Sequence, residues 1–152
     1  MLRDRIKESM KTAMKAKDQI GLAATRLIQA ALKDRDIAAR SKGNTDGISD
    51  DEILSMLQSM IKQRRDSIQM YESGGRPELA EREAREIDVI ESFLPEQMDE
   101  DATNAAIDAV MKELEASSMK DMGRVMAALK ERHAGSMDFG KASGLVKARL
   151  GS

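Results

Sequence analysis

Apolar residues recur along most of the chain at steps of three and four, the spacing of one face of an α-helix. Polar segments, glycines and prolines divide this pattern into predicted helices at residues 2–16, 18–40, 49–73, 77–93, 99–114, 119–129 and 138–150. No segment shows the alternation expected of a β-strand. The pattern therefore predicts an all-α protein.

The predicted helix starts carry recognisable capping residues. Ser49 and Glu52 form a capping box, and Pro77 suits the first turn of the next helix. Gly74 ends the helix before it, and Pro95 follows the fourth helix. Four other helices begin after a polar cap residue: Asp18, Asp99, Ser118 and Asp138.

The order and length of the helices predict two domains. The first four are expected to form a bundle over residues 1–94, with the two long members paired as a hairpin across the Gly43–Gly47 loop. Phe93–Met98 is the predicted boundary. The last three helices are too short to be stable alone, so they are expected to pack as a three-helix tail domain over residues 95–152.

Two side-chain patterns describe the predicted bundle further. The long second helix is expected to bury the apolar stripe Leu22, Ala23, Leu27, Ala30, Ala31 and Ile37. The acidic side chains of the fourth helix are spread around it and are expected to be solvated: Glu78, Glu81, Glu83, Glu86, Asp88 and Glu91.

Composition narrows the classes of function. The 152-residue chain has 12 methionines, one tyrosine, two phenylalanines, one histidine and no cysteine. Disulfides, thiol nucleophiles and cysteine-based metal sites are thereby excluded. The apolar runs are too short to span a bilayer, and the N-terminus lacks the apolar core of a signal peptide, so we expect a cytoplasmic protein.

The net charge of −2 is distributed unevenly along the chain. Residues 1–48 carry 11 basic and 6 acidic side chains (+5), residues 49–118 carry 7 and 18 (−11), and residues 119–152 carry 7 and 3 (+4). This pattern fits either a polarised surface or a set of ordinary solvated helix faces.

The sequence offers little support for catalytic chemistry. His133 lies near a predicted helix end, where it most simply complements the helix dipole. No glycine-rich phosphate loop and no serine-nucleophile motif occurs. We expect no catalytic residue, no cofactor and no metal site.

Nucleic-acid binding is better supported, by the tail. Met119–Leu129 places its apolar residues on one helix face and Lys120 and Arg124 on another, with Gly123 between them. The last helix also combines glycines and lysine on one side. Bare glycines let a sugar-phosphate backbone approach closely, while basic side chains neutralise its phosphates.

The predicted RNA-binding residues are Lys120, Gly123, Arg124, Lys130, Lys141, Gly144 and Lys147, with Arg132 as a further source of charge. Because aromatic stacking residues are missing, recognition of structured RNA by shape and backbone is favoured over single strands. The alternative explanation is that Gly123 and Gly144 accommodate tight helix packing. A second, weaker basic surface is predicted in the bundle at Lys11, Lys15, Lys17, Arg26, Lys33, Lys62, Arg64 and Arg65.

Five segments of the chain stand in a distinctive order: Met14–Asp18, Arg26–Leu32, Lys62–Ile68, Phe93–Gln97 and Ser117–Met126. Together they resemble the YqeY family, small bacterial proteins of the GatB/YqeY group, over essentially the whole chain. The resemblance implies a four-helix domain followed by a three-helix tail. A similar tail in the B subunit of the glutamine-dependent tRNA amidotransferase contacts tRNA, which implies contact here through Lys120, Gly123 and Arg124.

We therefore expect a tRNA-binding accessory protein. The resemblance also implies an association with carbon–nitrogen ligation that uses glutamine as amide donor, although no residue of this chain is a candidate for that reaction. The alternative is a protein-interaction adaptor, docking through its methionine-rich helices onto an amidotransferase, an aminoacyl-tRNA synthetase or a ribosome-associated partner. Neither membrane nor DNA binding is expected.

Overall fold

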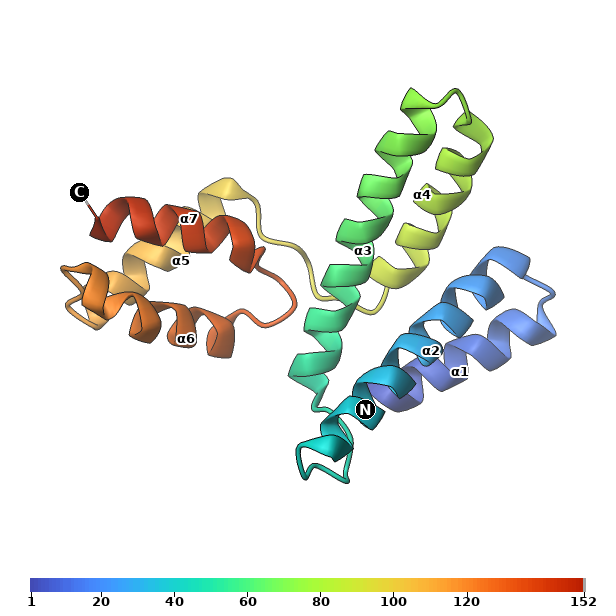
Figure 1. Ribbon diagram of the computed structural model, residues 1–152, viewed down its shortest axis with the longest axis horizontal. Coiled ribbons are helices and arrows are strands. Elements are labelled where there is room, and N and C mark those ends of the chain that lie inside the picture. Colours follow the sequence, from blue (N-terminus) through green and yellow to red (C-terminus); the bar gives the residue numbers. More distant parts are fainter. Residues whose placement is uncertain (152) are drawn as a thin grey trace. The chain divides into compact units, whose positions relative to one another are not determined.

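The computed structural model describes residues 1–151, and every regular element in this range is a helix, which confirms the all-α prediction for that part of the chain. The chain divides into two compact units, Met1–Pro95 and Glu96–Ser152 (Figure 1). The first contains α1 (Leu2–Lys15), α2 (Gln19–Ser41), α3 (Asp50–Ser73) and α4 (Pro77–Glu91). The second contains α5 (Glu100–Glu113), the 3-10 turn η1 (Met119–Asp121), α6 (Met122–Arg132) and α7 (Phe139–Leu150).

Helix starts follow the predicted caps. The Asp18 carboxylate accepts the backbone N–H of Gly21 at 3.0 Å and so begins α2. Ser49 and Glu52 form the reciprocal capping box of α3, in which the Glu52 N–H donates to Ser49 Oγ at 3.2 Å. The side chains of Asp99 and Asp138 cap α5 and α7 in the same way.

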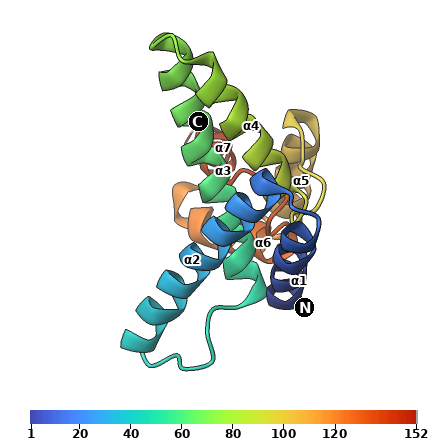
Figure 2. The ribbon, with the colours of Figure 1, turned by 90° about the vertical axis from the view of Figure 1, so that its right-hand side faces the viewer.

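The first unit is built from two helix hairpins. α1 packs against α2, α3 packs against α4, and α2 also contacts α4 (Figure 2). Their shared core is almost entirely aliphatic: Leu2, Ile6, Ile28, Leu32, Ile48, Ile53, Met56, Leu57, Ile61, Ile87, Ile90 and Phe93. Such helices depend mainly on this packing for their stability.

The predicted pairing of the two long helices is wrong. α2 makes only slight contact with α3 and packs instead on α1 and α4. The reason lies in the connecting loop, where Ile48 is buried and its backbone is held on both sides. Its N–H donates to Asp36 Oδ1 at 2.9 Å, and its carbonyl accepts from Arg3 at 2.9 Å. These bonds make the loop a corner between α2 and α3.

The predicted buried stripe of α2 is also wrong in part. Leu27 and Ile37 are 43% and 50% exposed, whereas the buried face includes Ala24, Thr25, Ile28 and Leu32. Because the polar residue Thr25 lies on the core face, the spacing of apolar residues alone does not identify the buried face of α2. The Thr25 hydroxyl is satisfied inside the helix because it donates to the backbone carbonyl of residue 21 at 2.8 Å.

One acidic side chain predicted to be solvated is buried. Glu86 of α4 is 5% exposed and accepts a hydrogen bond from the Arg64 guanidinium of α3, which also donates to Glu83 at 2.6 Å. Arg64 therefore links α3 to α4 and does not belong to an open basic surface. Arg65 next to it forms an exposed pair with Glu91 at 3.1 Å.

The second unit has its own aliphatic core, formed by Ile107, Val110, Val125, Leu129, Met137, Ala142, Val146 and Leu150. Hydrogen bonds to the loop before α7 hold the segment that enters this unit. Gln97 Nε2 donates to the carbonyl of Gly135 at 2.6 Å, and the Met98 N–H donates to the carbonyl of Ser136 at 2.8 Å. Among the described helices, none combines the length and apolar character needed to cross a membrane.

The Arg64–Glu86 contact gives a first testable prediction. We expect Arg64→Ala to lower the free energy of unfolding by about 3 kcal/mol, because it leaves a buried carboxylate without its closest cation. Urea denaturation measures this, with Lys62→Ala on the same helix as the exposed control. The double variant Arg64→Met, Glu86→Leu should recover most of the loss. Equal stability of the Arg64 and Lys62 variants would contradict the account.

The Arg3–Asp36 pair gives a second, pH-dependent prediction. Two hydrogen bonds of 2.7 Å from Arg3, with the Ile48 N–H, hold the pKa of Asp36 at about 2, below its unfolded value near 4. The ion pair therefore stabilises the fold above pH 4, and this stabilisation is lost as the pH falls from about 4 to about 2. We expect Asp36→Asn to cost about 2 kcal/mol at pH 7 and much less at pH 2, measured by denaturation at both pH values. A cost that does not depend on pH would contradict this.

Candidate functional site

The carboxylate of Asp121 organises the start of α6. It accepts the backbone N–H of Ser117 at 2.9 Å, the N–H of Ser118 at 3.2 Å, and a hydrogen bond from Arg124 at 2.6 Å. The Ser117 amide, the Arg124 guanidinium and the Ser118 amide hold the pKa of Asp121 at about 2. The carboxylate is therefore charged at neutral pH and holds the turn that precedes the helix.

This turn changes the predicted helix at residues 119–129. Met119–Asp121 forms η1, and the α-helix begins only at Met122. Val125 and Leu129 are buried as predicted, and Met126 packs partly against the same core. Met119 is 43% exposed, so the prediction that it shares the buried face is wrong. The 3-10 turn places it out of step with the α-helical period.

The guanidinium of Arg124 is engaged within the unit. Besides Asp121, it donates to the backbone carbonyl of Leu114 at 3.2 Å, at the end of α5. Arg124 thus joins the start of α6 to the end of α5. Arg132, the other predicted source of positive charge on α6, forms a two-bond pair with Glu113 of α5 at 2.6 and 2.8 Å. Both arginines are partly neutralised by carboxylates of the tail itself.

The lysines of the predicted site are in a different situation. Lys120, Lys130, Lys141 and Lys147 are all exposed, and none takes part in a salt bridge within residues 1–151. Their charges are available to an anionic partner.

The structure brings part of the predicted site together. A shallow groove of about 480 Å³ is lined by Met119, Gly144, Lys147, Ala148 and Gly151, at the contact of η1 with α7. A Cβ atom placed on Gly151 would lie 3.8 Å from Met119 Sδ. The thioether therefore lies against the end of α7.

The other predicted residues do not line this groove. Lys120 adjoins Met119 in η1, and Lys141 lies in the first turn of α7. Lys130 lies near the far end of α6, about 10 Å along its axis from Gly123. The site is thus a spread surface with one groove.

The two predicted glycines face open space. A Cβ atom placed on Gly123 or Gly144 would meet no atom within 4 Å. The alternative explanation, that these glycines accommodate tight helix packing, is therefore wrong for both. Each leaves a patch of bare helix backbone on the exposed side of the tail.

Comparison with known proteins assigns the chain to a family. The family model described as "Yqey-like protein" matches residues 3–150. The chain belongs to the YqeY-like family. The match spans nearly all of both units.

Several fungal proteins named "Altered inheritance of mitochondria protein 41, mitochondrial" are similar to this YqeY-like chain. The Candida glabrata protein is 33% identical over 91 residues, 60% of this chain and 48% of the relative. The Lachancea thermotolerans protein is 30% identical over 109 residues, 72% of this chain and 55% of the relative. A Saccharomyces cerevisiae protein is 33% identical over 89 residues, 59% and 46%. The chain spans about half the length of these curated relatives.

Sequence reasoning missed three groove residues of this YqeY-like protein, namely Met119, Ala148 and Gly151. Ala148 carries no chemical signal, and Gly151 follows the last predicted helix. For Met119 the sequence does contain a signal, because this residue directly follows the cap residue Ser118. First-turn residues often depart from the α-helical period.

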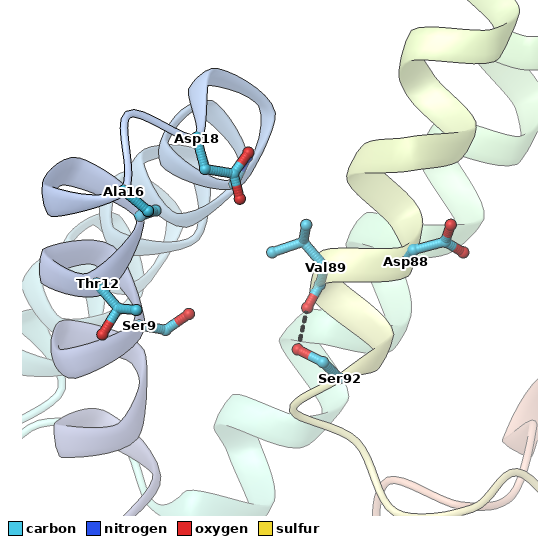
Figure 3. Close-up of a pocket in the computed structure, with 9 residues that line it drawn as sticks. Ser9, Thr12, Ala16, Asp18, Asp88, Val89 and Ser92 are labelled. Atoms are coloured by element: carbon cyan, nitrogen blue, oxygen red, sulfur yellow. Dashed lines mark hydrogen bonds between the residues drawn. The ribbon is translucent and has the colours of Figure 1, made fainter.

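The first unit holds a separate cavity of about 370 Å³ between α1, α2 and α4 (Figure 3). Several of its polar groups are already engaged or turned away. Asp18 caps α2, the Ser92 hydroxyl donates to the carbonyl of Val89 at 2.5 Å, and Asp88 points away from the cavity. In the described part of the chain, no three His, Cys, Asp or Glu side chains lie close enough to hold a metal ion.

The glycine geometry gives a third testable prediction. We expect Gly144→Ala to raise the free energy of unfolding by up to about 1 kcal/mol, because alanine favours the helix and its methyl group meets no neighbour. Gly135→Ala is the contrasting control. Gly135 is buried with φ +79°, so a side chain there should destabilise the fold. Thermal or urea unfolding measures both, and a destabilising Gly144→Ala would contradict the open-space geometry.

Proposed function

We propose that this YqeY-like protein binds tRNA through the exposed face of α6 and α7, as an accessory protein without catalytic machinery of its own. In this proposal the three-helix tail of residues 95–152 acts as a domain distinct from the four-helix domain of residues 1–94. The observation that carries it is a set of four exposed lysines, three on α6 and α7 and one in η1, that form no salt bridge among the described residues, together with one bare glycine on each of the two helices.

Each part of the surface has a physical role in the proposal. Lysines neutralise phosphates and release their counterions, which supplies affinity without reading the sequence. The exposed backbone at Gly123 and Gly144 lets a ribose-phosphate chain approach more closely than a side chain would allow. The groove beside Lys147, with Met119 and Ala148 as its apolar lining, suits a ribose or base edge of a folded RNA.

The acidic side chains of the tail affect some of these lysines more than others. Asp121 is paired with Arg124, and the Asp138 carboxylate accepts the N–H that begins α7. Glu131 is exposed next to Lys130 and takes part in no salt bridge among the described residues. Phosphate contact should therefore be strongest near Lys120 and Lys147 and weakest at Lys130.

Its place of action and its partners follow as further proposals. We propose the cytoplasm for this chain, while the word mitochondrial in the fungal names applies to those proteins. An amidotransferase or a synthetase would meet this protein through the tRNA that they share. Direct docking of the adaptor type instead predicts partners that remain bound after RNA is removed, which a pull-down after nuclease treatment detects.

A gel-shift titration with tRNA at several salt concentrations tests the RNA proposal. We expect Lys120→Glu with Lys147→Glu to weaken tRNA binding by about tenfold or more. The slope of the logarithm of the binding constant against the logarithm of the salt concentration should fall in magnitude by about 2, because two phosphate contacts are lost. The matched control is Lys42→Glu with Lys112→Glu. It carries the same change in net charge at two other exposed lysines.

The control separates local contact from overall charge. Equal weakening by the two double variants would contradict a tail site, since only net charge would then matter. Wild-type affinity no higher for tRNA than for a scrambled RNA of equal length would contradict recognition of the folded tRNA. Adding Arg124→Glu tests the predicted arginine, but its loss also removes the bonds to Asp121 and Leu114, so folding must be verified first.

A further inference from the structure

The first unit exposes large apolar side chains on α1 and α2 that its own core does not use. Met14 is 53% exposed, and Leu27 and Ile37 are the exposed large hydrophobic residues of α2. Leu27 and Ile37 lie about 15 Å apart along the helix axis. Ala30 lies between them, and Ala23 lies one turn before Leu27, on the same side of α2. This apolar stripe faces away from the core.

A groove of about 520 Å³ runs beside this stripe, between α1 and α2. It is lined by Arg3, Lys7, Gln29, Ala30, Leu32, Lys33, Asp36, Ile37 and Arg40. Four of these side chains are cations and one is a carboxylate, and Arg3 already neutralises that carboxylate. Lys7, Lys33 and Arg40 take part in no salt bridge within the described residues. The groove is therefore strongly basic, with Ile37 at its edge.

Gln29 lies in the wall of the same groove with an unmet hydrogen bond. Its side-chain Nε2 is buried and has no acceptor among the described residues. A buried amide without a partner is unfavourable, and such groups are uncommon in folded proteins. A rotation of the Gln29 side chain toward the groove would let this amide donate to a carboxylate or carbonyl oxygen of a ligand.

The basic and apolar features continue along α1. Arg3, Lys7, Met10 and Met14 are three or four residues apart and so share one side of this helix. α1 and α2 run antiparallel, joined by a short turn, with Arg3 contacting Asp36 near the end of α2 (Figure 2). Cations at the Arg3 end and a methionine at the turn end thus border one continuous α1–α2 face.

The mixture of charges and apolar groups distinguishes two kinds of partner. A nucleic-acid backbone would use the cations but would leave Met14, Leu27 and Ile37 in water. An amphipathic helix laid into the groove would cover the apolar side chains with its own and pair its carboxylates with the cations. The exposed side chains of this face therefore favour a protein segment.

We propose that the α1–α2 face, made of the groove and the stripe beside it, docks an acidic amphipathic helix of a partner protein. Carboxylates of that helix would pair with Lys7, Lys33 and Arg40. Apolar residues spaced over about three turns would cover Leu27 and Ile37. Asp34 is exposed between these two, so the partner carries an uncharged or basic residue at that point.

The probe is a synthetic, fluorescently labelled peptide of about 18 residues, with leucines on one helical face and glutamates on the other. Binding to the full-length protein is measured by fluorescence anisotropy. We expect Lys33→Glu and Ile37→Ser each to weaken binding about tenfold. Lys62→Glu and Met70→Ser are matched controls, because both side chains are exposed on α3 away from the groove, and they should leave binding unchanged.

Further measurements distinguish an acidic helix from other occupants of the α1–α2 face. A peptide of the same composition in scrambled order, or with lysine for glutamate, should bind much more weakly than the designed peptide. Equal binding of these peptides, or no effect of Lys33→Glu and Ile37→Ser, would overturn the proposal. Loss of tRNA binding by Lys33→Glu without loss of peptide binding would assign the face to RNA instead. A wild-type dimer that Ile37→Ser dissociates would make a second copy its occupant.

This test is independent of the tail. Lys120→Glu with Lys147→Glu should leave the peptide affinity unchanged, since neither residue belongs to the α1–α2 face. Failure of tRNA binding and failure of peptide binding are thus separate results.

Discussion

Burial of a small aliphatic core holds the tail unit together, and its exposed surface depends on that core. Helices of eleven to fourteen residues are marginal in water on their own, so α5, α6 and α7 persist because they share buried side chains such as Ile107, Leu129 and Val146. Each helix uses one face for this packing. The opposite faces of α6 and α7 are left for glycines and lysines that contribute nothing to the core.

Arginines and lysines have different electrostatic roles in this protein. Several arginines form ion pairs that join helices or turns, among them Arg3 with Asp36, Arg64 with Glu83 and Glu86, Arg124 with Asp121, and Arg132 with Glu113. The planar guanidinium suits such fixed, multiply hydrogen-bonded contacts. Lysines on both candidate surfaces lie outside these pairs. The positive charge available to partners is therefore mainly lysine charge, in the tail and on the α1–α2 face alike.

Local features were predictable from the sequence because they depend on neighbouring residues. The caps at Asp18 and Ser49 and the stops at Gly74 and Pro95 involve residues within one turn. Features set by distant residues were not. The buried face of α2 depends on α1 and α4, and a satisfied Thr25 conceals it. From the sequence alone Glu86 is expected to be exposed, and only the fold shows that Arg64 of another helix pairs with it. For the tail, residue types indicated the lysines and glycines, but the pairing of Arg124 and the exposure of Met119 required the 3-10 turn.

Mapping the RNA-binding surface residue by residue tests the central claim most directly. Amide chemical shifts of ¹⁵N-labelled protein are followed while unlabelled tRNA is added at physiological salt. The account predicts that the largest changes fall in Met119–Arg124 and Gly140–Gly151, with little change in Glu100–Glu113. Changes confined to α1 and α2, or no changes in the tail at saturating tRNA, would contradict a tail domain that binds RNA through its lysines and bare glycines.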